Sequence, residues 1–296
     1  MSLQVYDKIN TLYKRYIFDG KSCPNQKWLK FKNKIILGNF SSKEGEYLFN
    51  NPWEAYSKID GTCSKIIFYP STQTIAVGGK SDKAESMHGQ FEMLQEIGER
   101  IKPKLCELFP KESARFTPIK GDDNKIKYLD IESSKDITPT NEGKYGVTLE
   151  EIPIYIYGEY FGEGIQACGK RYISKGNKFL VFDIKQQGWW TPKEVRDSLC
   201  EELGLEQVPF IGIMTLSEIE DMVYKGFTTK YEEASDKTLM EEGIVARPTI
   251  PLFDGSNKRV IIKVKYHDYV GYENARKEFS DEEFTEFNTW YFENYV

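Results

Sequence analysis

A lysine and a carboxylate lie two residues apart in Lys58-Ile59-Asp60-Gly61, and a glycine follows them directly. If this segment ends a strand, the period of two points Lys58 and Asp60 to the same side. Gly61 then permits a tight turn or a close approach of the backbone to a ligand. A lysine amine is a nucleophile only when it is neutral, which requires desolvation or neighbouring positive charge. The motif alone fits a nucleophilic lysine or a solvated turn.

A second basic motif lies in the apolar run 261–266, which places Lys263 and Lys265 on one face of a predicted strand. The apolar residues Ile262 and Val264 then occupy the other face. Two ammonium groups side by side repel each other unless both face an anion such as a phosphate. The alternative is an edge strand that its lysines protect from pairing.

Three acidic or aromatic positions complete the set of candidate ligand contacts. Glu241 and Glu242 precede an apolar strand and suit a hard cation, although a solvated pair of turn carboxylates is the alternative. Glu159 lies between glycines at a strand end, where its carboxylate can accept from ribose hydroxyls. Phe182 lies in a buried-looking strand, where its ring either stacks on a base or belongs to the core.

One segment imitates a phosphate-binding loop. The run Gly164 to Lys170 fits the pattern G-x-x-x-x-G-K, but Arg171 stands where the loop needs Ser or Thr to hold magnesium. No regular parallel βα context surrounds it. We therefore reject a phosphate-binding loop at this position.

Apolar spacing and turn residues predict the elements that position these residues. Spacings of three and four predict helices over 5–17 and 84–109, and Pro103 is expected to kink or split the second. Strands are predicted at 65–69, 74–77, 154–160, 178–184, 243–248 and 259–266. Capping signals predict helix starts at Thr191, Ser217 and Ser280. Because helices and strands do not alternate regularly, we expect an α+β fold with antiparallel sheets.

Composition narrows the class of protein further. The 296 residues carry a formal net charge of −6, which argues against nucleic-acid binding by bulk charge but leaves room for a local basic groove. A segment with Lys27, Lys30, Lys32 and Lys34 either tracks phosphates or forms a solvated face. The five scattered cysteines support neither a disulfide framework nor a zinc site. We expect a soluble cytoplasmic protein with no membrane segment.

Five motifs in order resemble one enzyme superfamily. They are Lys58-Ile59-Asp60-Gly61, the run Gly158 to Gln166 (GEYFGEGIQ), Val181-Phe182-Asp183-Ile184, Glu242-Gly243-Ile244-Val245 and Lys263-Val264-Lys265. This set resembles the covalent nucleotidyltransferases, which include ATP-dependent ligases and mRNA capping enzymes. Within them it is most similar to RNA ligases of the bacteriophage RNA ligase 2 and RNA-editing ligase type. Five motifs in order are far more specific than any one of them.

The resemblance implies a role for each matching residue. Lys58 would attack the α-phosphate of ATP and form a lysyl-AMP, with Ile59, Asp60 and Gly61 beside the nucleotide. Glu159 would bind the ribose, Phe182 would stack on adenine and Glu242 would help to place Mg²⁺ or Mn²⁺. Lys263 and Lys265 would hold the α-phosphate and help to keep Lys58 deprotonated. AMP would then pass to an RNA 5′-phosphate, and a 3′-hydroxyl would displace it to seal the strand.

The chain departs from the family pattern in three places. Lys80 stands near the position where the family usually has an arginine, and a lysine cannot give the same bidentate contact. Cys63 replaces an arginine that is usual in DNA ligases, which argues against that branch. The 31 residues after Lys265 are too few for an OB-fold.

The resemblance also implies a domain layout and a substrate. We expect an ATP-grasp-like nucleotidyltransferase core over 51–270 with a polar insertion at 110–150 and no C-terminal OB-fold. An N-terminal helix and basic segment (1–50) and a short C-terminal helix (271–296) flank it. The expected partner is RNA with 3′-OH and 5′-phosphate ends, in a nicked duplex or another form, bound by a monomer. The alternatives are a DNA nick-sealing ligase, a capping-type nucleotidyltransferase and a non-catalytic strand-end-binding protein.

Overall fold

The computed structural model describes residues 6–80, 89–118, 149–186 and 188–296. The chain divides into two compact units. Unit 1 contains Cys63–Tyr160 and Phe179–Gln207, and unit 2 contains the described chain up to Thr62, Phe161–Lys178 and Val208–Val296. Each unit has a five-stranded sheet, and every strand pairing that the structure describes is antiparallel except one in unit 2. The expected α+β class with antiparallel sheets is confirmed.

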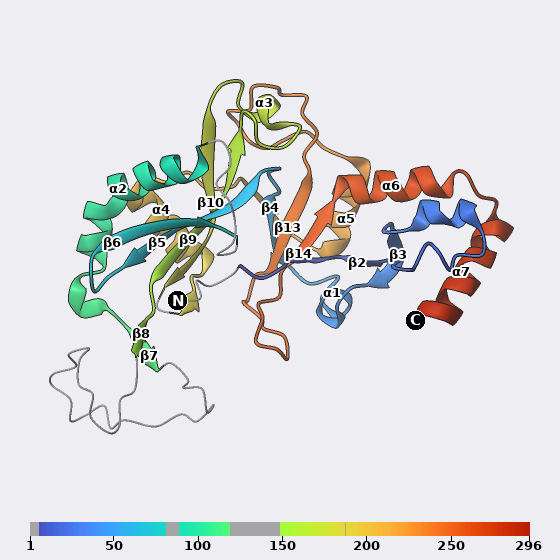
Figure 1. Cartoon of the computed structure of the whole chain (residues 1–296), viewed down its shortest axis with the longest axis horizontal. Coiled ribbons are helices and arrows are strands. Elements are labelled where there is room, and N and C mark those ends of the chain that lie inside the picture. Colours follow the sequence, from blue (N-terminus) through green and yellow to red (C-terminus); the bar gives the residue numbers. More distant parts are fainter. Residues whose placement is uncertain (1–5, 81–88, 119–148, 187) are drawn as a thin grey trace. The chain divides into compact units, whose positions relative to one another are not determined.

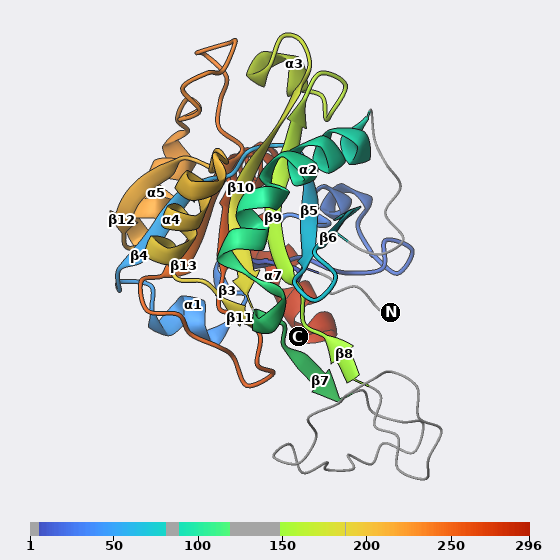
Figure 2. The same cartoon turned by 90° about the vertical axis from the view of Figure 1, so that its left-hand side faces the viewer.

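The sheet of unit 1 is covered on one face by two helices. Its strand order is β11 (Trp189–Trp190), β10 (Asn177–Gln186), β9 (Ile154–Gly162), β5 (Thr62–Tyr69) and β6 (Thr74–Gly79). Helices α2 (Gln90–Leu108) and α4 (Lys193–Leu203) lie across this face (Figures 1 and 2). Leu94, Ile101 and Cys200 from the helices pack there against Ile66 and Ile156 from the strands. Successive residues of a strand point to opposite faces, so the alternate residues of β5 and β9 point to the other face of this sheet.

Helix α2 confirms the predicted helix from residue 90 onward, and residues 81–88 lie outside the described part. Pro103 sits inside α2 without ending it. Helix α4 starts at Lys193 as the Thr191 signal predicted, but no side chain caps it. The polar insertion lies largely outside the described residues. Its described ends form the 3-10 turn η2 (Lys111–Ser113) and the antiparallel pair β7 (Phe116–Pro118) and β8 (Leu149–Glu151).

The sheet of unit 2 carries most of the lysine motifs. Its strand order is β1 (Asn10–Thr11), β14 (Ile262–Lys265), β13 (Gly243–Pro248), β4 (Trp53–Ser57) and β12 (Phe210–Met214). Strand β14 pairs with β13 on one side and, in parallel, with β1 on the other. Because β14 has a neighbour on both sides, the edge-strand explanation of Lys263 is wrong.

Helices α5 (Leu216–Lys225) and α6 (Tyr266–Arg276) belong to the core of unit 2. Leu216, Ile219 and Val223 of α5 are fully buried in the cluster that contains Ile262 and Val264. A capping box starts α5 at Thr215 and Glu218, two residues before the start predicted at Ser217. Among the described helices, none is both long and apolar enough to cross a bilayer.

The N-terminal region differs from the prediction. Where a helix was expected over 5–17, the described residues form β1 and β2 (Tyr13–Arg15), and β2 pairs with β3 (Ile35–Phe40). That prediction is wrong because Tyr13 and Tyr16 pack into an aromatic core contributed by distant residues, which overrides local spacing. The 3-10 helix η1 (Gln26–Phe31) and the short helix α1 (Lys43–Tyr47) follow.

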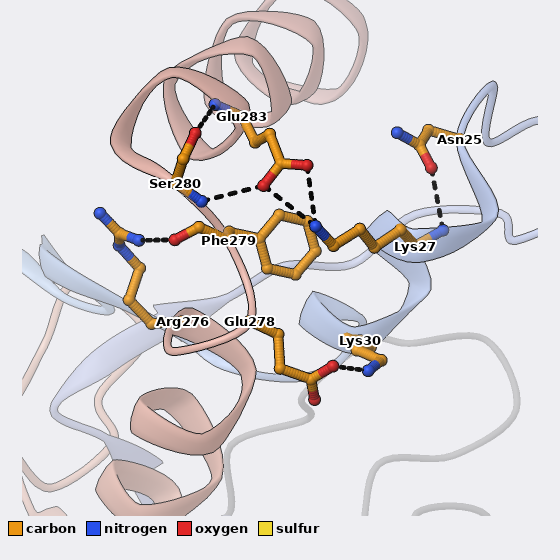
Figure 3. A network of polar contacts seen from close by, with 8 residues as sticks. All are labelled: Asn25, Lys27, Lys30, Arg276, Glu278, Phe279, Ser280 and Glu283. Atoms are coloured by element: carbon orange, nitrogen blue, oxygen red, sulfur yellow. Dashed lines mark hydrogen bonds and ion pairs between the residues drawn. The ribbon is translucent and has the colours of Figure 1, made fainter.

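Helix α7 (Asp281–Tyr295) closes this aromatic core. Its predicted capping box at Ser280 and Glu283 is confirmed. Phe287 is fully buried, and its ring stacks on Phe31 with centroids 4.7 Å apart. Figure 3 shows the polar side of the contact: Lys27 binds Glu283 at 2.8 Å, and Lys30 binds Glu278. Two lysines of the basic segment are therefore occupied by carboxylates.

Candidate functional site

Three strand ends of unit 2 bring the lysine motifs together. Lys58 follows β4, and its backbone N–H donates to the carbonyl of Gly243 at 3.0 Å. Lys265, the last residue of β14, pairs with Gly243 in the β13–β14 ladder. Glu242 precedes β13, and its carbonyl accepts from the N–H of Tyr266 at 3.0 Å. The sheet register thus places two ammonium groups and one carboxylate at a single point.

Glu242 joins both lysines. Its Oε1 lies 2.5 Å from Nζ of Lys265, and its Oε2 forms an ion pair with Nζ of Lys58. The Glu242 side chain is 10% exposed, and those of Lys58 and Lys265 are 20% and 29% exposed. The three charges are therefore only partly screened by solvent. Lys263, opposite Val245 in the ladder, lies on the same face of β14 as Lys265.

Gly243 explains how these strands approach so closely. A Cβ atom at this position would lie 2.0 Å from the carbonyl oxygen of Val264 and 2.9 Å from Cα of Lys265. Only glycine fits this close approach. The glycine after Glu242 is therefore required by the packing that sets Lys265 beside Glu242.

Glu241 is buried and hydrogen-bonded, whereas Glu242 is partly exposed. Its side chain is 1% exposed, and Oε2 accepts from the hydroxyl of Ser57 at 3.3 Å and from the N–H of Lys230 at 3.1 Å. Burial raises the pKa of Glu241 above its usual value, while these hydrogen bonds act in the opposite direction. Glu241 anchors the end of β4 next to Lys58. Of the two carboxylates, Glu242 remains the candidate for a cation.

The turn after Lys58 is held by a segment of the same unit. Asp60 Oδ2 accepts from the thiol of Cys168 at 3.1 Å, and the carbonyl of Gly61 accepts from Nε2 of Gln166 at 3.3 Å. Ile59 is buried, and Asp60 and Gly61 are half-buried. The sequence alone did not identify Cys168 as a contact of this turn, because its partner Asp60 lies more than 100 positions earlier in the chain.

The remaining predicted residues belong to unit 1. Glu159 lies on β9 and is half-buried, Phe182 lies on β10 and is half-buried, and Lys80 follows β6 and is exposed. The charges of Glu159 and Lys80 both act on the thiol of Cys63. Burial is the main cause that raises the pKa of the Cys63 thiol to about 12, with Glu159 adding to the rise and Lys80 opposing it.

Lys65 is a residue that the sequence patterns missed. It lies on β5 and is fully buried, close enough to Cys63 to lower the pKa of the thiol. Asp183, which is also fully buried, acts on the same thiol in the opposite direction. A lysine in an apolar strand gives no sequence signal for burial, since lysines are usually exposed.

The carboxylates of this site suit a divalent cation that takes most of its ligands from water and substrate phosphates. In the described part of the chain, no group of three or more His, Cys, Asp or Glu side chains is arranged to hold a metal ion. Mg²⁺ is usually bound by one or two carboxylates together with water and substrate phosphates. Glu242 is the candidate for that carboxylate, and its two oxygens are paired with Lys58 and Lys265 in this structure.

Comparisons with known proteins give one family. The RNA ligase family matches residues 51–265. No curated protein matches the sequence.

Among solved structures, a Naegleria gruberi RNA ligase mutant with ATP and Mn has 16% sequence identity and a TM-score of 0.46. The alignment covers 78% of this chain and 54% of that one. Another mutant of that ligase with AMP and Mn gives the same values, and the ligase with PPi is 17% identical with the same TM-score and coverage. The chain thus spans about half the length of these ligases.

Proposed function

Because the chain belongs to the RNA ligase family, we propose that it is an ATP-dependent RNA ligase that works through a lysyl-AMP at Lys58. The observation that carries this proposal is the convergence of Lys58, Lys265 and Glu242 at the ends of three strands. Two ammonium groups in a partly buried position are suited to an anionic substrate. An ATP phosphate group has the required charge.

The first step transfers AMP to the protein. Nζ of Lys58 attacks the α-phosphorus of ATP, a P–N bond forms, and the bond to the pyrophosphate oxygen breaks. Lys58 must first leave its ion pair with Glu242 and lose a proton, because an ammonium group has no lone pair for attack. Lys263 and Lys265 neutralise the charge on the α-phosphate in the transition state.

Phosphate binding by the lysines would also release Glu242. Its carboxylate neutralises Lys58 and Lys265 in the absence of nucleotide. Once phosphate oxygens take that place, Glu242 is available to bind Mg²⁺ or Mn²⁺. When bound, the cation supplies charge neutralisation for the phosphates. The proposed nucleoside contacts are Glu159 with the ribose, Phe182 with adenine and Lys80 with a phosphate.

The next two steps seal RNA. The 5′-phosphate of one RNA end attacks the AMP phosphorus and displaces Lys58. The 3′-hydroxyl of the other end then attacks the activated phosphate, and AMP leaves as the phosphodiester forms. We propose that a monomer acts on RNA with 3′-OH and 5′-phosphate ends, in a nicked duplex or another form. An intracellular location is proposed because all five cysteines are free thiols.

A sealing assay tests the proposal. Labelled nicked RNA duplex, broken single-stranded RNA and the matching DNA duplex are incubated with ATP and Mg²⁺. The expected result is joining of RNA ends only when the upstream end is a 3′-OH and the downstream end a 5′-phosphate. Joining of DNA but not RNA would contradict the assignment. Guanylylation from GTP in place of AMP transfer would instead indicate a capping-type enzyme.

A further inference from the structure

The segment whose spacing imitates a phosphate-binding loop has another role in the structure. Residues Phe161–Lys178 belong to the same compact unit as Lys58. The only helix in this segment, α3, has four residues (Gly169–Tyr172), and no side chain caps it. A single turn of this kind does not reproduce the long helix on which a phosphate-binding loop relies. Its contacts point instead to the turn after Lys58.

Cys168 makes the most specific of these contacts. Its thiol donates to Oδ2 of Asp60 at 3.1 Å. Burial is the main cause that raises the pKa of the thiol to about 12, and the hydrogen bond to Asp60 adds to the rise. The sulfur therefore keeps its proton at neutral pH and remains a hydrogen-bond donor. A thiol in that state is a poor nucleophile and a poor metal ligand.

The support behind Cys168 is rigid. A Cβ atom on Gly169 would lie 1.8 Å from the carbonyl oxygen of Gly162, so the backbone on the C-terminal side of Cys168 is packed directly on the end of β9. Tyr172 is 1% exposed, and its ring meets Phe161 edge-on with centroids 5.6 Å apart. A side chain held by such packing positions its partner within a narrow range.

Hydrogen bonds to a second loop, which contains Ser235 and Asp236, also hold this segment. The carbonyls of Arg171 and Tyr172 each accept a backbone hydrogen bond at 2.9 Å, from Asp236 and Ser235 respectively. Nε of Arg171 also lies 2.7 Å from Oδ2 of Asp236. Arg171, which occupies the position that excluded a phosphate-binding loop, is thus part of the support.

We propose that Cys168 is a positioning residue for the adenylation of Lys58, acting through its hydrogen bond to Asp60. The inference rests on the proposed function and adds a residue to it. Asp60 is two positions after Lys58, and the intervening Ile59 is buried, so the orientation of the Asp60 carboxylate and the placement of the lysine are linked. Small displacements of a reacting group reduce the rate of a transfer strongly.

Replacement of the thiol tests the role in catalysis. Cys168→Ala is expected to slow AMP transfer to Lys58 about fivefold, the loss of one hydrogen bond of about 1 kcal/mol. Cys168→Ser is expected to stay within about twofold of the wild-type rate, because a hydroxyl donates to the same carboxylate. The matched control is Cys106→Ala, which removes a half-buried thiol from α2. Single-turnover rates with labelled ATP are compared at a temperature where circular dichroism shows every variant to be folded.

A wild-type rate in Cys168→Ala, or equal losses in the Ala and Ser variants, would overturn the positioning role. The hydrogen bond itself is tested without any enzymatic activity. Iodoacetamide alkylation of Cys168 at pH 8.5, followed by peptide mass spectrometry, is expected to be several-fold faster in Asp60→Ala than in wild type. Equal alkylation rates would show that Asp60 does not hold the thiol. Absence of AMP transfer in the wild type counts against the proposed function, and the alkylation rates decide the contact in either case.

Discussion

At the scale of single residues, Glu242 joins Lys58 and Lys265 of unit 2. One carboxylate pairs with two lysines that come from different strand ends, and its side chain is 10% exposed. Partly buried charges that share one partner are coupled, so removal of any one changes the others. The same position would be taken by phosphate oxygens when ATP binds. Glu242 and the nucleotide are therefore expected to compete for the lysines.

Loss of Lys265 tests this arrangement. Lys265→Ala is expected to lower the single-turnover rate of lysine adenylation by about 10²-fold or more, because an electrostatic contact to the transferring phosphate is lost. The matched control is Lys225→Ala, which removes an exposed lysine paired with Asp221 on α5. A wild-type rate in Lys265→Ala would remove this residue from the site. Lys263→Ala, measured beside it, is expected to show a loss in the same direction.

The charged residues of the site were largely predictable, whereas their buried support was not. Lys58, Glu242 and Lys265 belong to motifs that are recognisable along the chain, and the sheet of unit 2 brings them together. Glu241 is adjacent to Glu242 in sequence, yet it is buried and hydrogen-bonded to Ser57, while Glu242 faces the lysines. Local pattern does not reveal which of two neighbouring carboxylates is buried. The contact between Cys168 and Asp60 depends on long-range folding in the same way.

At the scale of elements, the antiparallel register of β13 and β14 holds the site together. The strand prediction at 243–248 is confirmed, since an apolar run bounded by glycine and proline favours a strand. The prediction at 259–266 is confirmed only over Ile262–Lys265, because α6 begins at Tyr266. The N-terminal helix prediction is wrong, because spacings of three and four in residues 5–17 reflect aromatic side chains that pack with α7 and β3. A pattern of that length cannot report a partner such as Tyr291, which lies 275 positions after Tyr16.

Gly243→Ala tests the register. The added Cβ would meet the Val264 carbonyl oxygen at 2.0 Å, so the strands must separate or shift. We expect a loss of about 3 kcal/mol in the free energy of unfolding, together with loss of adenylation. Gly255→Ala is the matched control, because a Cβ there meets no atom within 4 Å. Urea unfolding of both variants gives the comparison, and equal stability of the two would contradict the close approach.

The contact between β2, α5 and α6 predicts a dependence of stability on alkaline pH. The hydroxyls of Tyr13 and Tyr269 donate to the two oxygens of Glu220 at 2.9 and 3.2 Å. Burial first, and Glu220 second, raise the pKa of both phenols above its usual value. A group whose pKa is raised by folding stabilises the protein fully below its unfolded pKa of about 10. That contribution is lost as the pH rises further.

We therefore expect the free energy of unfolding to fall between pH 9 and pH 11, and to fall less in Tyr13→Phe than in wild type. At pH 7 the same variant should lose about 1.5 to 3 kcal/mol, the range for a hydrogen bond to a charged group. Tyr47→Phe, at an exposed position, is the control. Urea unfolding at the three pH values measures both effects. Parallel pH profiles of wild type and Tyr13→Phe would show that this phenol does not titrate as proposed.

At the scale of the whole molecule, RNA binding depends on both the net charge and the local groups of lysines. The formal charge of −6 disfavours attraction of RNA over the whole surface. The basic segment, which sequence left open between a phosphate track and a solvated face, pairs Lys27 and Lys30 with carboxylates of the α6–α7 region (Figure 3). Lys27 also lies 4.5 Å from the ring centre of Phe279. These two lysines secure the C-terminal helices and do not offer unpaired charge to RNA.

A double variant tests that conclusion. Lys27→Ala with Lys30→Ala is expected to leave the KM for nicked RNA, and its dependence on salt, within about twofold of wild type. The free energy of unfolding should fall by about 1 kcal/mol or less per pair, since both pairs are partly exposed. A shallower dependence of log KM on log salt in the double variant would instead assign these lysines to RNA phosphates. The Lys225→Ala variant again serves as the control for a lost surface charge.

The central claim is that Lys58 accepts AMP. The most direct measurement is the intact mass of the purified protein after incubation with ATP and Mg²⁺, followed by peptide mapping. The expected result is a gain of one AMP located on Lys58, released as free AMP when RNA with a 5′-phosphate and a 3′-hydroxyl is added, and absent in Lys58→Ala. No gain in mass, or a gain that persists in Lys58→Ala, would contradict the account.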